Sequence, residues 1–184
     1  NVSVFLGEKY LVTIHSGQFR VMENLFHLLC QANEETRQQN LEYGSGYLLY
    51  RVLDAMVDAY FPILNSIVGW IDDIEDAVFD ENVEAAREIA TLRRDILTQR
   101  RLIHSLRTVT AELERKIRRF IKTDISIQFS DLKDHLNRIC ETLDEAKEAV
   151  EIFKDSDYVL STERLNHIMR ILTIISTIML PLLV

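Results

Sequence analysis

The stretch FSDLKDHLNRICETLDEAKEAVEIF, from Phe129 to Phe153, decides the fold of this chain. Its apolar residues recur at steps of three and four without interruption, at Phe129, Leu132, Leu136, Ile139, Leu143, Ala146, Val150 and Phe153. A repeat that averages 3.5 residues forms one apolar stripe along a helix, as in a coiled coil. Because neither glycine nor proline occurs between Ser126 and Leu180, we expect a single helix from about residue 126 to the end of the chain. Such a helix is over ~80 Å long.

Two stretches before it have the same period and predict two further helices. The apolar positions of the first are Leu49, Val52, Met56, Tyr60, Ile63, Ile67, Trp70, Ile74 and Val78. Those of the second are Ile89, Leu92, Ile96, Ile103, Leu106, Leu113, Ile117 and Phe120, with Gln99 and Thr110 at two further positions of the stripe. Pro62 should kink the first helix, because it lacks an amide hydrogen and its ring clashes with the preceding turn. We expect residues 44–81 and 83–122 to form a long antiparallel hairpin packed on the third helix.

The first residues of the chain have a different pattern. Apolar residues alternate with other residues on either side of the turn Gly7-Glu8-Lys9, which predicts a β-hairpin. A lone two-stranded hairpin is marginally stable in water, so we expect these strands to belong to a larger sheet whose other strands lie outside this chain. Residues 19–33 predict a short amphipathic helix, and the polar stretch 33–46 a connector.

Charge is distributed in blocks along the chain, whose net charge is −8. Residues 44–81 contain one basic and eight acidic residues, residues 82–122 eleven basic and five acidic, and residues 124–157 four basic and ten acidic. This alternation favours electrostatic matching between neighbouring helices. A nucleic-acid surface is disfavoured, because the basic residues are interleaved with the apolar repeat and flanked by acidic segments.

Motifs of catalysis are missing from the sequence. It contains no glycine-rich phosphate loop, no nucleophile elbow and no HExxH motif, so we do not expect an enzyme. The two cysteines, Cys30 and Cys140, have no second cysteine or histidine at ligand spacing, and we expect both to be reduced, buried thiols.

The chain ends on ILTIISTIMLPLLV, residues 171–184, which carry no charge and directly follow Arg170. A helix that spans a bilayer needs ~20 apolar residues, so by length alone this segment fits a buried core helix or the start of a membrane span. Arg170 at its border is typical of the cytoplasmic side of a span. Because the segment is still apolar at its last residue, we favour a span that continues beyond the chain.

Together these patterns predict a mainly α chain in four parts. Residues 1–42 are the incomplete end of an N-terminal domain, of which the β-hairpin is a remnant; the resemblance described below implies that this domain is α/β. Residues 43–123 form the antiparallel helical hairpin, and residues 124–170 a very long stalk helix. Residues 171–184 are the truncated start of a transmembrane helix.

Four stretches carry a resemblance to a known family: YLLYRVLDAMVDAYF, TLRRDILTQRRLIHSLR, FSDLKDHLNRI and RLNHIMRILTIISTIMLPLLV. With them the chain resembles the CorA family of divalent-cation channels over most of its length. The resemblance implies the cytosolic part, and the start of the first transmembrane helix, of a homopentamer in the cell (inner) membrane. The family's Gly-Met-Asn signature at the outer mouth of the pore would lie beyond the last residue.

The resemblance also implies a regulatory Mg²⁺ site, with Asp54 and Asp131 as two of its ligands. Mg²⁺ prefers carboxylates and water in octahedral geometry, so the aspartates are better candidates than the histidines. His135 lies four residues after Asp131, and we interpret the two as a local pair on one helix face rather than as metal ligands. From the residues alone, each aspartate is interpreted as an ordinary solvated surface charge, and only the resemblance favours Asp54 and Asp131 as ligands.

The last helix has a mixed stripe that fits a pore. Its members lie at spacings of three and four on one face: Asn166, Met169, Thr173, Ser176 and Leu180. A partly polar stripe on a membrane helix should face water or the interior of a bundle. The positions that the resemblance assigns to the pore lining or gate are Asn166, Met169, Leu172 and Leu180. Helix–helix packing through small polar residues is the alternative interpretation.

We therefore expect a Mg²⁺ channel that intracellular Mg²⁺ closes by bridging carboxylates of neighbouring subunits, a mechanism that the resemblance implies. One alternative is a transporter of Zn²⁺, Co²⁺ or Ni²⁺ of the ZntB type, because nothing in the sequence separates these cations. The other is a structural three-helix coiled-coil scaffold, which explains the three periodic stretches but not the uncharged end or the β-hairpin.

Overall fold

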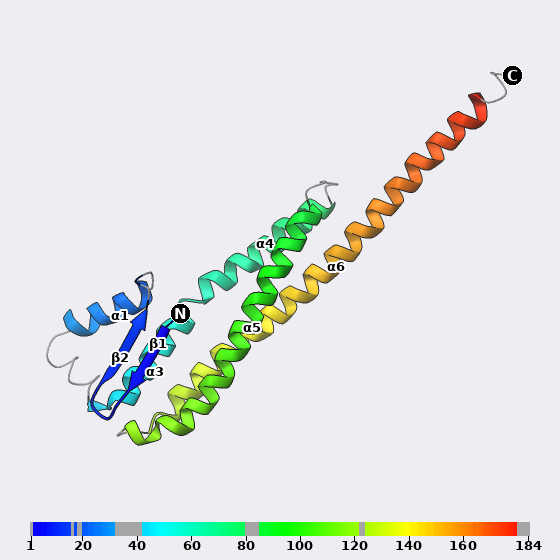
Figure 1. Cartoon of the computed structure of the whole chain (residues 1–184). Helices are drawn as coiled ribbons and strands as arrows, with labels where there is room; N and C mark the ends of the chain where they lie inside the picture. The colour runs from blue at the N-terminus through cyan, green and yellow to red at the C-terminus, as the bar shows by residue number, and fades with distance from the viewer. Residues whose placement is uncertain are drawn as a thin grey trace. The chain divides into compact units, whose positions relative to one another are not determined.

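The computed structural model describes residues 2–15, 17, 20–31, 42–79, 85–121 and 124–179. Its elements, labelled in Figure 1, are β1 (Val2–Leu6), β2 (Leu11–His15), α1 (Arg20–Gln31), α3 (Ser45–Asp58), α4 (Phe61–Phe79), α5 (Ala85–Ile117), the short 3₁₀-helix η1 (Arg118–Phe120) and α6 (Ser126–Met179). The chain is mainly helical, as predicted, and no strand follows β2 within the described ranges.

The chain folds into two compact units. The first combines Asn1–Ser66 with Thr98–Asp144, and the second combines Ile67–Leu97 with Glu145–Val184. Helices α4, α5 and α6 each contribute a segment to both units. The division predicted from the sequence, at residues 42, 123 and 170, follows the order of the chain instead and stays a prediction.

In the first unit β1 and β2 form the predicted antiparallel hairpin (Figure 1). Leu6 pairs with Leu11, and the amide of Gly7 donates a 3.0 Å hydrogen bond to the carbonyl of Tyr10 across the turn. The hydroxyl of Ser45, a buried residue at the start of α3, donates to the carbonyl of Gly7. The hairpin turn is therefore fastened to the first turn of α3.

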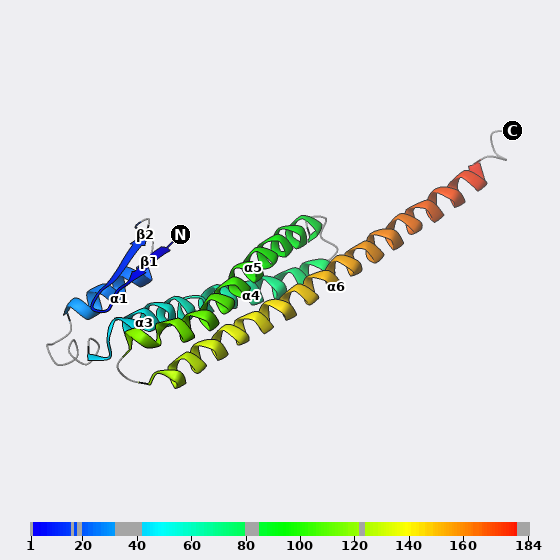
Figure 2. The ribbon, with the colours of Figure 1, turned by 60° about the horizontal axis from the view of Figure 1, so that its bottom comes forward.

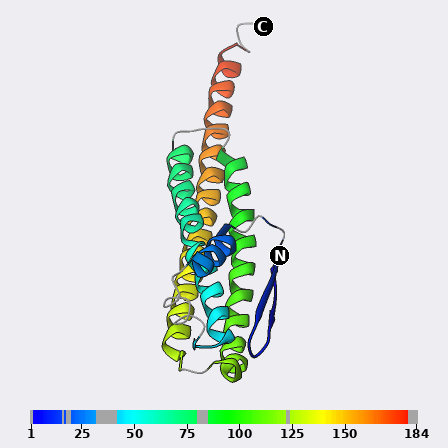
Figure 3. The ribbon, with the colours of Figure 1, turned by 90° about the vertical axis from the view of Figure 1, so that its left-hand side faces the viewer.

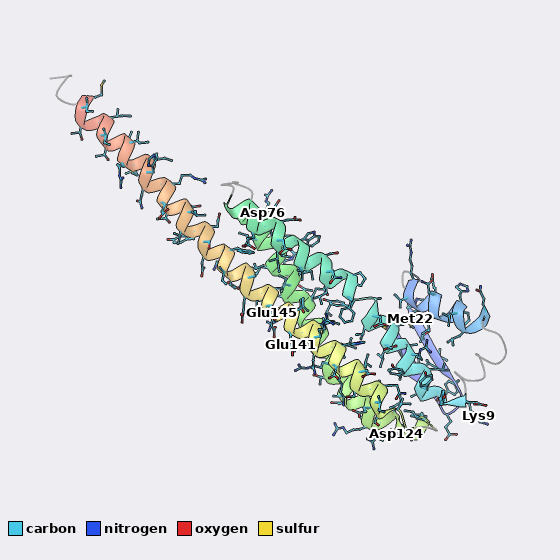
Figure 4. All side chains as sticks on the ribbon, turned by 180° about the vertical axis from the view of Figure 1, so that it is seen from behind. Lys9, Met22, Asp76, Asp124, Glu141 and Glu145 are labelled. Carbon is cyan, nitrogen blue, oxygen red and sulfur yellow. The ribbon has the colours of Figure 1, made fainter. Side chains whose placement is uncertain are left out.

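Helix α1 lies beside α3 and confirms the short amphipathic helix predicted over residues 19–33. Met22 is buried and lies on the side of α1 that faces α3, as Figure 4 shows. The same figure places Lys9 at the tip of the β-hairpin. The two-stranded sheet and one short helix are thus held by α3.

Two glycines allow α3 to approach η1 closely. Gly44 has a φ of 92°, a conformation that L side chains rarely adopt, and a Cβ there would lie 2.7 Å from the carbonyl oxygen of Phe120. A Cβ on Gly46 would lie 2.5 Å from Cγ1 of Ile121. This close approach fixes the N-terminal end of α3 within the first unit.

The core of the first unit lies along α6. Residues 98–117 of α5 and 126–144 of α6 run antiparallel and side by side (Figure 2). The predicted stripe of α6 is confirmed, since none of its side chains in this unit is accessible: Phe129, Leu132, Leu136, Ile139 and Leu143. Arg100 pairs with Asp144, and Lys133 pairs with Glu114, along the edges of this contact.

The second unit has a three-helix core of its own, formed by segments of α4, α5 and α6 (Figure 3). Its buried residues are Ile67, Ile74, Ile89, Leu92, Ile96, Ala146, Val150 and Phe153. Arg93 of α5 donates a 2.7 Å hydrogen bond to Glu151 of α6. This pair matches the charges of the basic and acidic segments, as the sequence predicted.

The predicted stripe of the first long run is confirmed at some positions and wrong at others. Ile67 and Ile74 are buried as predicted, but Ile63 and Trp70 are 48% and 52% exposed, and Leu64 is buried in place of Ile63. The helix is interrupted before Pro62, where α3 ends at Asp58 and α4 begins at Phe61 after a two-residue turn. The kink predicted at Pro62 is thus a break between two helices, and next to the break the buried position moves by one residue.

The prediction for the cysteines is half right. Both thiols are free, and Cys140 is buried as expected, but Cys30 is exposed. Its prediction fails because α1 is amphipathic and directs only one face, which includes Met22, toward α3.

The C-terminal segment of α6 is exposed on all sides. Every residue from 161 to 179 is accessible. Within the described ranges, one stretch is apolar and long enough to cross a membrane, Ser45–Asp76; its 18-residue window has a mean hydropathy of 1.3, and 22% of that window is buried. The span predicted at 171–184 lies partly outside the described residues and stays a prediction.

Candidate metal centre

Two carboxylates lie on the last turn of α3. Asp54 and Asp58 are four residues apart, and α3 ends at Asp58, so both side chains lie on one helix face at its C-terminal end. Asp54 is half-buried and Asp58 is exposed. A helix C-terminus carries partial negative charge, which makes this position more favourable for a cation than for two carboxylates.

His135 of α6 is the third member of the group. The ligand atoms of Asp54, Asp58 and His135 all lie within 4.8 Å of one another. The distance from Nδ1 of His135 to Oδ1 of Asp58 is 3.8 Å, too long for a hydrogen bond. All three residues belong to the first unit. Two helices thus bring two oxygen ligands and one nitrogen ligand to one place.

The imidazole of His135 is held by an aromatic neighbour. The ring of Phe61 lies 5.7 Å from it at an angle of 88°, an edge-to-face contact. Although 44% of the His135 side chain is exposed, its Nδ1 atom is buried and has no hydrogen-bond partner among the residues that the structure describes. A buried ring nitrogen without a partner, facing a carboxylate, fits a bound cation, because neutral imidazole is a metal ligand.

Burial and the neighbouring carboxylate make the charged form of Asp54 unfavourable without a counter-charge. The pKa of Asp54 is raised, chiefly by burial and next by the charge of Asp58. A hydrogen bond from Tyr50 and the charges of Arg51 and His135 act in the opposite direction. Because the pKa of Asp54 is raised overall, the positive groups nearby do not fully offset the cost of burying its negative charge. A divalent cation would supply the missing charge.

Asp131, the other predicted ligand, does not join this group in the structure. It is exposed on α6, one helical turn before His135, and its charge acts on the hydroxyl of Tyr50. The local pairing predicted between Asp131 and His135 is replaced by the approach of His135 to Asp58. Asp131 is therefore near the candidate centre without being one of its three ligands.

The predicted pore residues lie on the exposed end of α6. Those within the described part are Asn166, Met169, Leu172, Thr173 and Ser176, and all are accessible. The hydroxyl of Thr173 donates a 2.7 Å hydrogen bond to the carbonyl of Met169, four residues earlier, so its polarity is satisfied within the helix. Leu180 lies outside the described residues. The pore assignment stays a prediction.

Sequence reasoning missed Asp58 and set aside His135. The spacing of four between Asp54 and Asp58, in LDAMVDA, is a sequence signal for two carboxylates on one helix face. Nothing in the sequence brings His135 to that face, because the approach depends on how α3 and α6 align. Two carboxylates and an imidazole can hold a divalent cation, and the imidazole adds affinity for transition metals.

Comparison with known proteins identifies relatives over the whole chain. Residues 1–184 match the family described as "CorA-like Mg2+ transporter protein". The chain is 28% identical over 98% of its length to the "Putative metal ion transporter YfjQ" of Bacillus subtilis, of which it covers 56%. It is 33% identical over 74% of its length to the "Cobalt/magnesium transport protein CorA" of Thermotoga maritima, of which it covers 39%.

Further relatives include a protein named for zinc and a solved magnesium transporter. The "Zinc transport protein ZntB" of Pectobacterium atrosepticum is 21% identical over 98% of this chain and is 53% covered. The solved CorA magnesium transporter of Methanocaldococcus jannaschii has the same fold, with a TM-score of 0.76 and 22% identity over 95% of this chain and 54% of that one. The chain thus spans about half the length of these relatives.

Proposed function

The chain belongs to the CorA family, and we propose that it is part of a transporter of divalent cations in which Asp54, Asp58 and His135 bind a regulatory cation. The observation that carries the regulatory site is the buried, unpartnered Nδ1 of His135 beside two carboxylates. Mg²⁺ is the first candidate, since the family is described by it and carboxylate oxygens suit it.

The same proposal covers the assembly and the membrane. The protein forms a homopentamer, with this chain mostly in the cytoplasm and α6 continuing into the membrane at its C-terminal end. The exposed apolar surface of residues 161–179 supports this placement, because a helix that is apolar on most sides needs a partner or lipid. Asn166, Met169, Leu172, Thr173, Ser176 and Leu180 then line the pore or its gate.

The regulatory step is a shift between two states. When the cation is bound, Asp54 and Asp58 are neutralised and α3 is tied to α6 through His135. When the cation leaves, the two carboxylates repel each other and His135 is released from its contact. A ligand shifts such an equilibrium only by its different affinity for the two states. In this proposal the cation binds the closed state more tightly than the open one. Asp131 and residues of a neighbouring subunit complete the site in the pentamer.

Calorimetric titration with Mg²⁺ tests the site directly. Replacing Asp54 and Asp58 together by Asn should weaken Mg²⁺ binding roughly tenfold or more, because affinity depends on the number of charged ligands. Asp72 and Asp76 of α4 provide a matched control, since they have the same spacing of four, are both exposed and lie outside the centre. Equal losses in both double variants would reduce the centre to ordinary surface charge.

Flux measurements test the regulation. At high internal Mg²⁺ the wild-type transporter should be largely closed, and the Asp54→Asn, Asp131→Asn variant partly open. The test belongs at high Mg²⁺, because at low Mg²⁺ the loss of affinity and the loss of repulsion oppose each other. If the two proteins conduct equally little across a full Mg²⁺ titration, these aspartates have no regulatory role.

A transition-metal cation is the second candidate, and His135 favours it. Imidazole suits Zn²⁺, Co²⁺ and Ni²⁺, whereas Mg²⁺ prefers oxygen ligands only. The variant His135→Gln should therefore weaken Zn²⁺ and Co²⁺ binding more than Mg²⁺ binding. If it changes the three affinities by the same factor, the centre does not distinguish these cations through its imidazole.

A further inference from the structure

We infer that Tyr50 is a positioning residue of the metal centre, which holds the carboxylate of Asp54 in the orientation that binds the cation; the inference rests on the function proposed above. Tyr50 lies four residues before Asp54 on α3, so the two side chains share a helix face. Their side chains are joined by a hydrogen bond in which the hydroxyl donates to the carboxylate.

The ring of Tyr50 is fixed by packing. Tyr50 is 8% exposed, and its ring lies 5.8 Å from the ring of Phe129, a fully buried residue of α6. On its other side, Tyr47 lies at a ring distance of 5.8 Å, and Tyr43 stacks on Tyr47 at 4.9 Å. A ring held between two aromatic neighbours places its hydroxyl at a defined point, which a flexible side chain cannot do.

The hydroxyl orients Asp54 by occupying part of its hydrogen-bonding capacity. A carboxylate has about four lone-pair sites, so a bond from Tyr50 restricts its rotation and leaves lone pairs free for a cation. Hydrogen bonds to metal-binding carboxylates have this role in metal sites in general, and their loss costs about 10–100-fold in metal affinity. Asp58 has no such partner in the described part of the chain, so Asp54 is the better oriented of the two ligands.

The hydroxyl of Tyr50 lies near both aspartates that the sequence singled out, although only Asp54 belongs to the group of three.

The test is a titration of the purified full-length protein in detergent with Co²⁺, whose visible absorption reports the geometry of its ligands. Tyr50→Phe keeps the ring contacts and removes only the hydroxyl. It should weaken Co²⁺ binding about tenfold and change the shape of the bound-Co²⁺ spectrum. The control Tyr47→Phe removes a hydroxyl from the same row of rings and should leave both unchanged.

A second measurement uses the unmodified site and a colourless cation. Binding of Mg²⁺ should perturb the ultraviolet absorption of tyrosine in the wild type and in Tyr47→Phe, but not in Tyr50→Phe. An unperturbed wild type under saturating Mg²⁺ would overturn the inference, as would a Tyr50→Phe variant with wild-type Co²⁺ affinity and spectrum. Failure of the proposed function is recognised separately, because Asp54→Asn would then leave Co²⁺ binding intact as well.

Discussion

Two regions of α6 carry similar apolar residues and have opposite exposure. In the region Phe129–Phe153 every apolar residue of the heptad stripe is buried, while charged residues occupy the other faces. In the region 161–179 every residue is exposed, and the large apolar ones are Leu165, Ile168, Met169, Ile171, Leu172, Ile174, Ile175, Ile178 and Met179. Figure 4 illustrates the first case, since the labelled Glu141 and Glu145 project from α6 away from its stripe.

The difference lies in the pattern of apolar residues and not in their number. An apolar residue at every third or fourth position forms a narrow stripe on one helix face. Neighbouring helices of the same chain cover such a stripe, so it is buried. From residue 171 to 179 apolar residues occupy most of the circumference, and no single neighbouring helix covers such a surface. The first region therefore stabilises the fold, and the second is available for lipid or for other copies of the chain.

The largest effect should separate the two regions by stability. Leu136→Ala, at a fully buried position of the stripe, should lower the free energy of unfolding by about 2–5 kcal/mol. Leu165→Ala, at an exposed position of the same helix, should change it by less than about 0.5 kcal/mol. Urea unfolding followed by circular dichroism compares them. Equal losses would mean that residue 165 is buried in the folded protein.

A smaller effect, of opposite sign, is expected at the one polar residue that the stripe of α5 buries. Thr110 is 1% exposed, and its hydroxyl has no hydrogen-bond partner within the described ranges. Thr110→Val keeps the shape and removes the unpaired hydroxyl, so it should stabilise the protein by about 1 kcal/mol. The control is Thr108→Val, because the exposed Thr108 donates a 3.1 Å hydrogen bond to the carbonyl of His104. A loss of stability in Thr110→Val would indicate that water reaches this position.

The ion pairs beside the stripe should contribute less. Arg100 and Asp144 pair at the edge of the α5–α6 contact in the first unit, with 27% and 45% of their side chains exposed. A double-mutant cycle with Arg100→Gln and Asp144→Asn should give a coupling of about 0.2–1 kcal/mol that decreases with added salt. A coupling above this range would mean that solvent is excluded from the pair.

The smallest change concerns Tyr60, in the turn between α3 and α4. Burial raises its pKa to about 12, and its hydroxyl donates to Oε1 of Gln99 at 3.1 Å. Since the folded state keeps this proton above the ordinary pKa of 10, the resulting stabilisation is full below pH 10 and is lost as the pH rises toward 12. A titration of tyrosine absorbance at alkaline pH should show that Tyr60→Phe has one phenol fewer that ionises near pH 12 than the wild type. An unchanged titration curve would place Tyr60 in open solvent.

The periodic stretches were predictable from the sequence because each is decided by its own residues. The stripe of α6 is confirmed throughout, and that of α5 is confirmed at the positions that are buried: Ile89, Leu92, Ile96, Ile103, Thr110 and Ile117. The buried position directly after Pro62 was not predictable, because Pro62 indicates an interruption but not how many residues the turn uses. That difference of one residue exchanges Ile63 for Leu64 as the buried side chain.

The candidate centre was predictable only in part. The resemblance indicated Asp54, and the spacing to Asp58 is visible in the sequence. His135 required the alignment of α3 with α6, which depends on the tertiary packing of the two helices. Local patterns describe a helix face well, but they do not state which residues of two faces meet.

The ligands of the candidate centre come from two places in the chain, with Asp58 and His135 separated by 77 positions in the sequence. A cation bound by both is present only in the folded protein, so it stabilises the fold by about 0.4 kcal/mol when its concentration equals its Kd and by about 1.4 kcal/mol at ten times that concentration. Proteases degrade the unfolded fraction, and this fraction falls as the cation concentration rises. The amount of the protein in the cell would therefore follow the cation supply, with slower turnover in cation-rich cells.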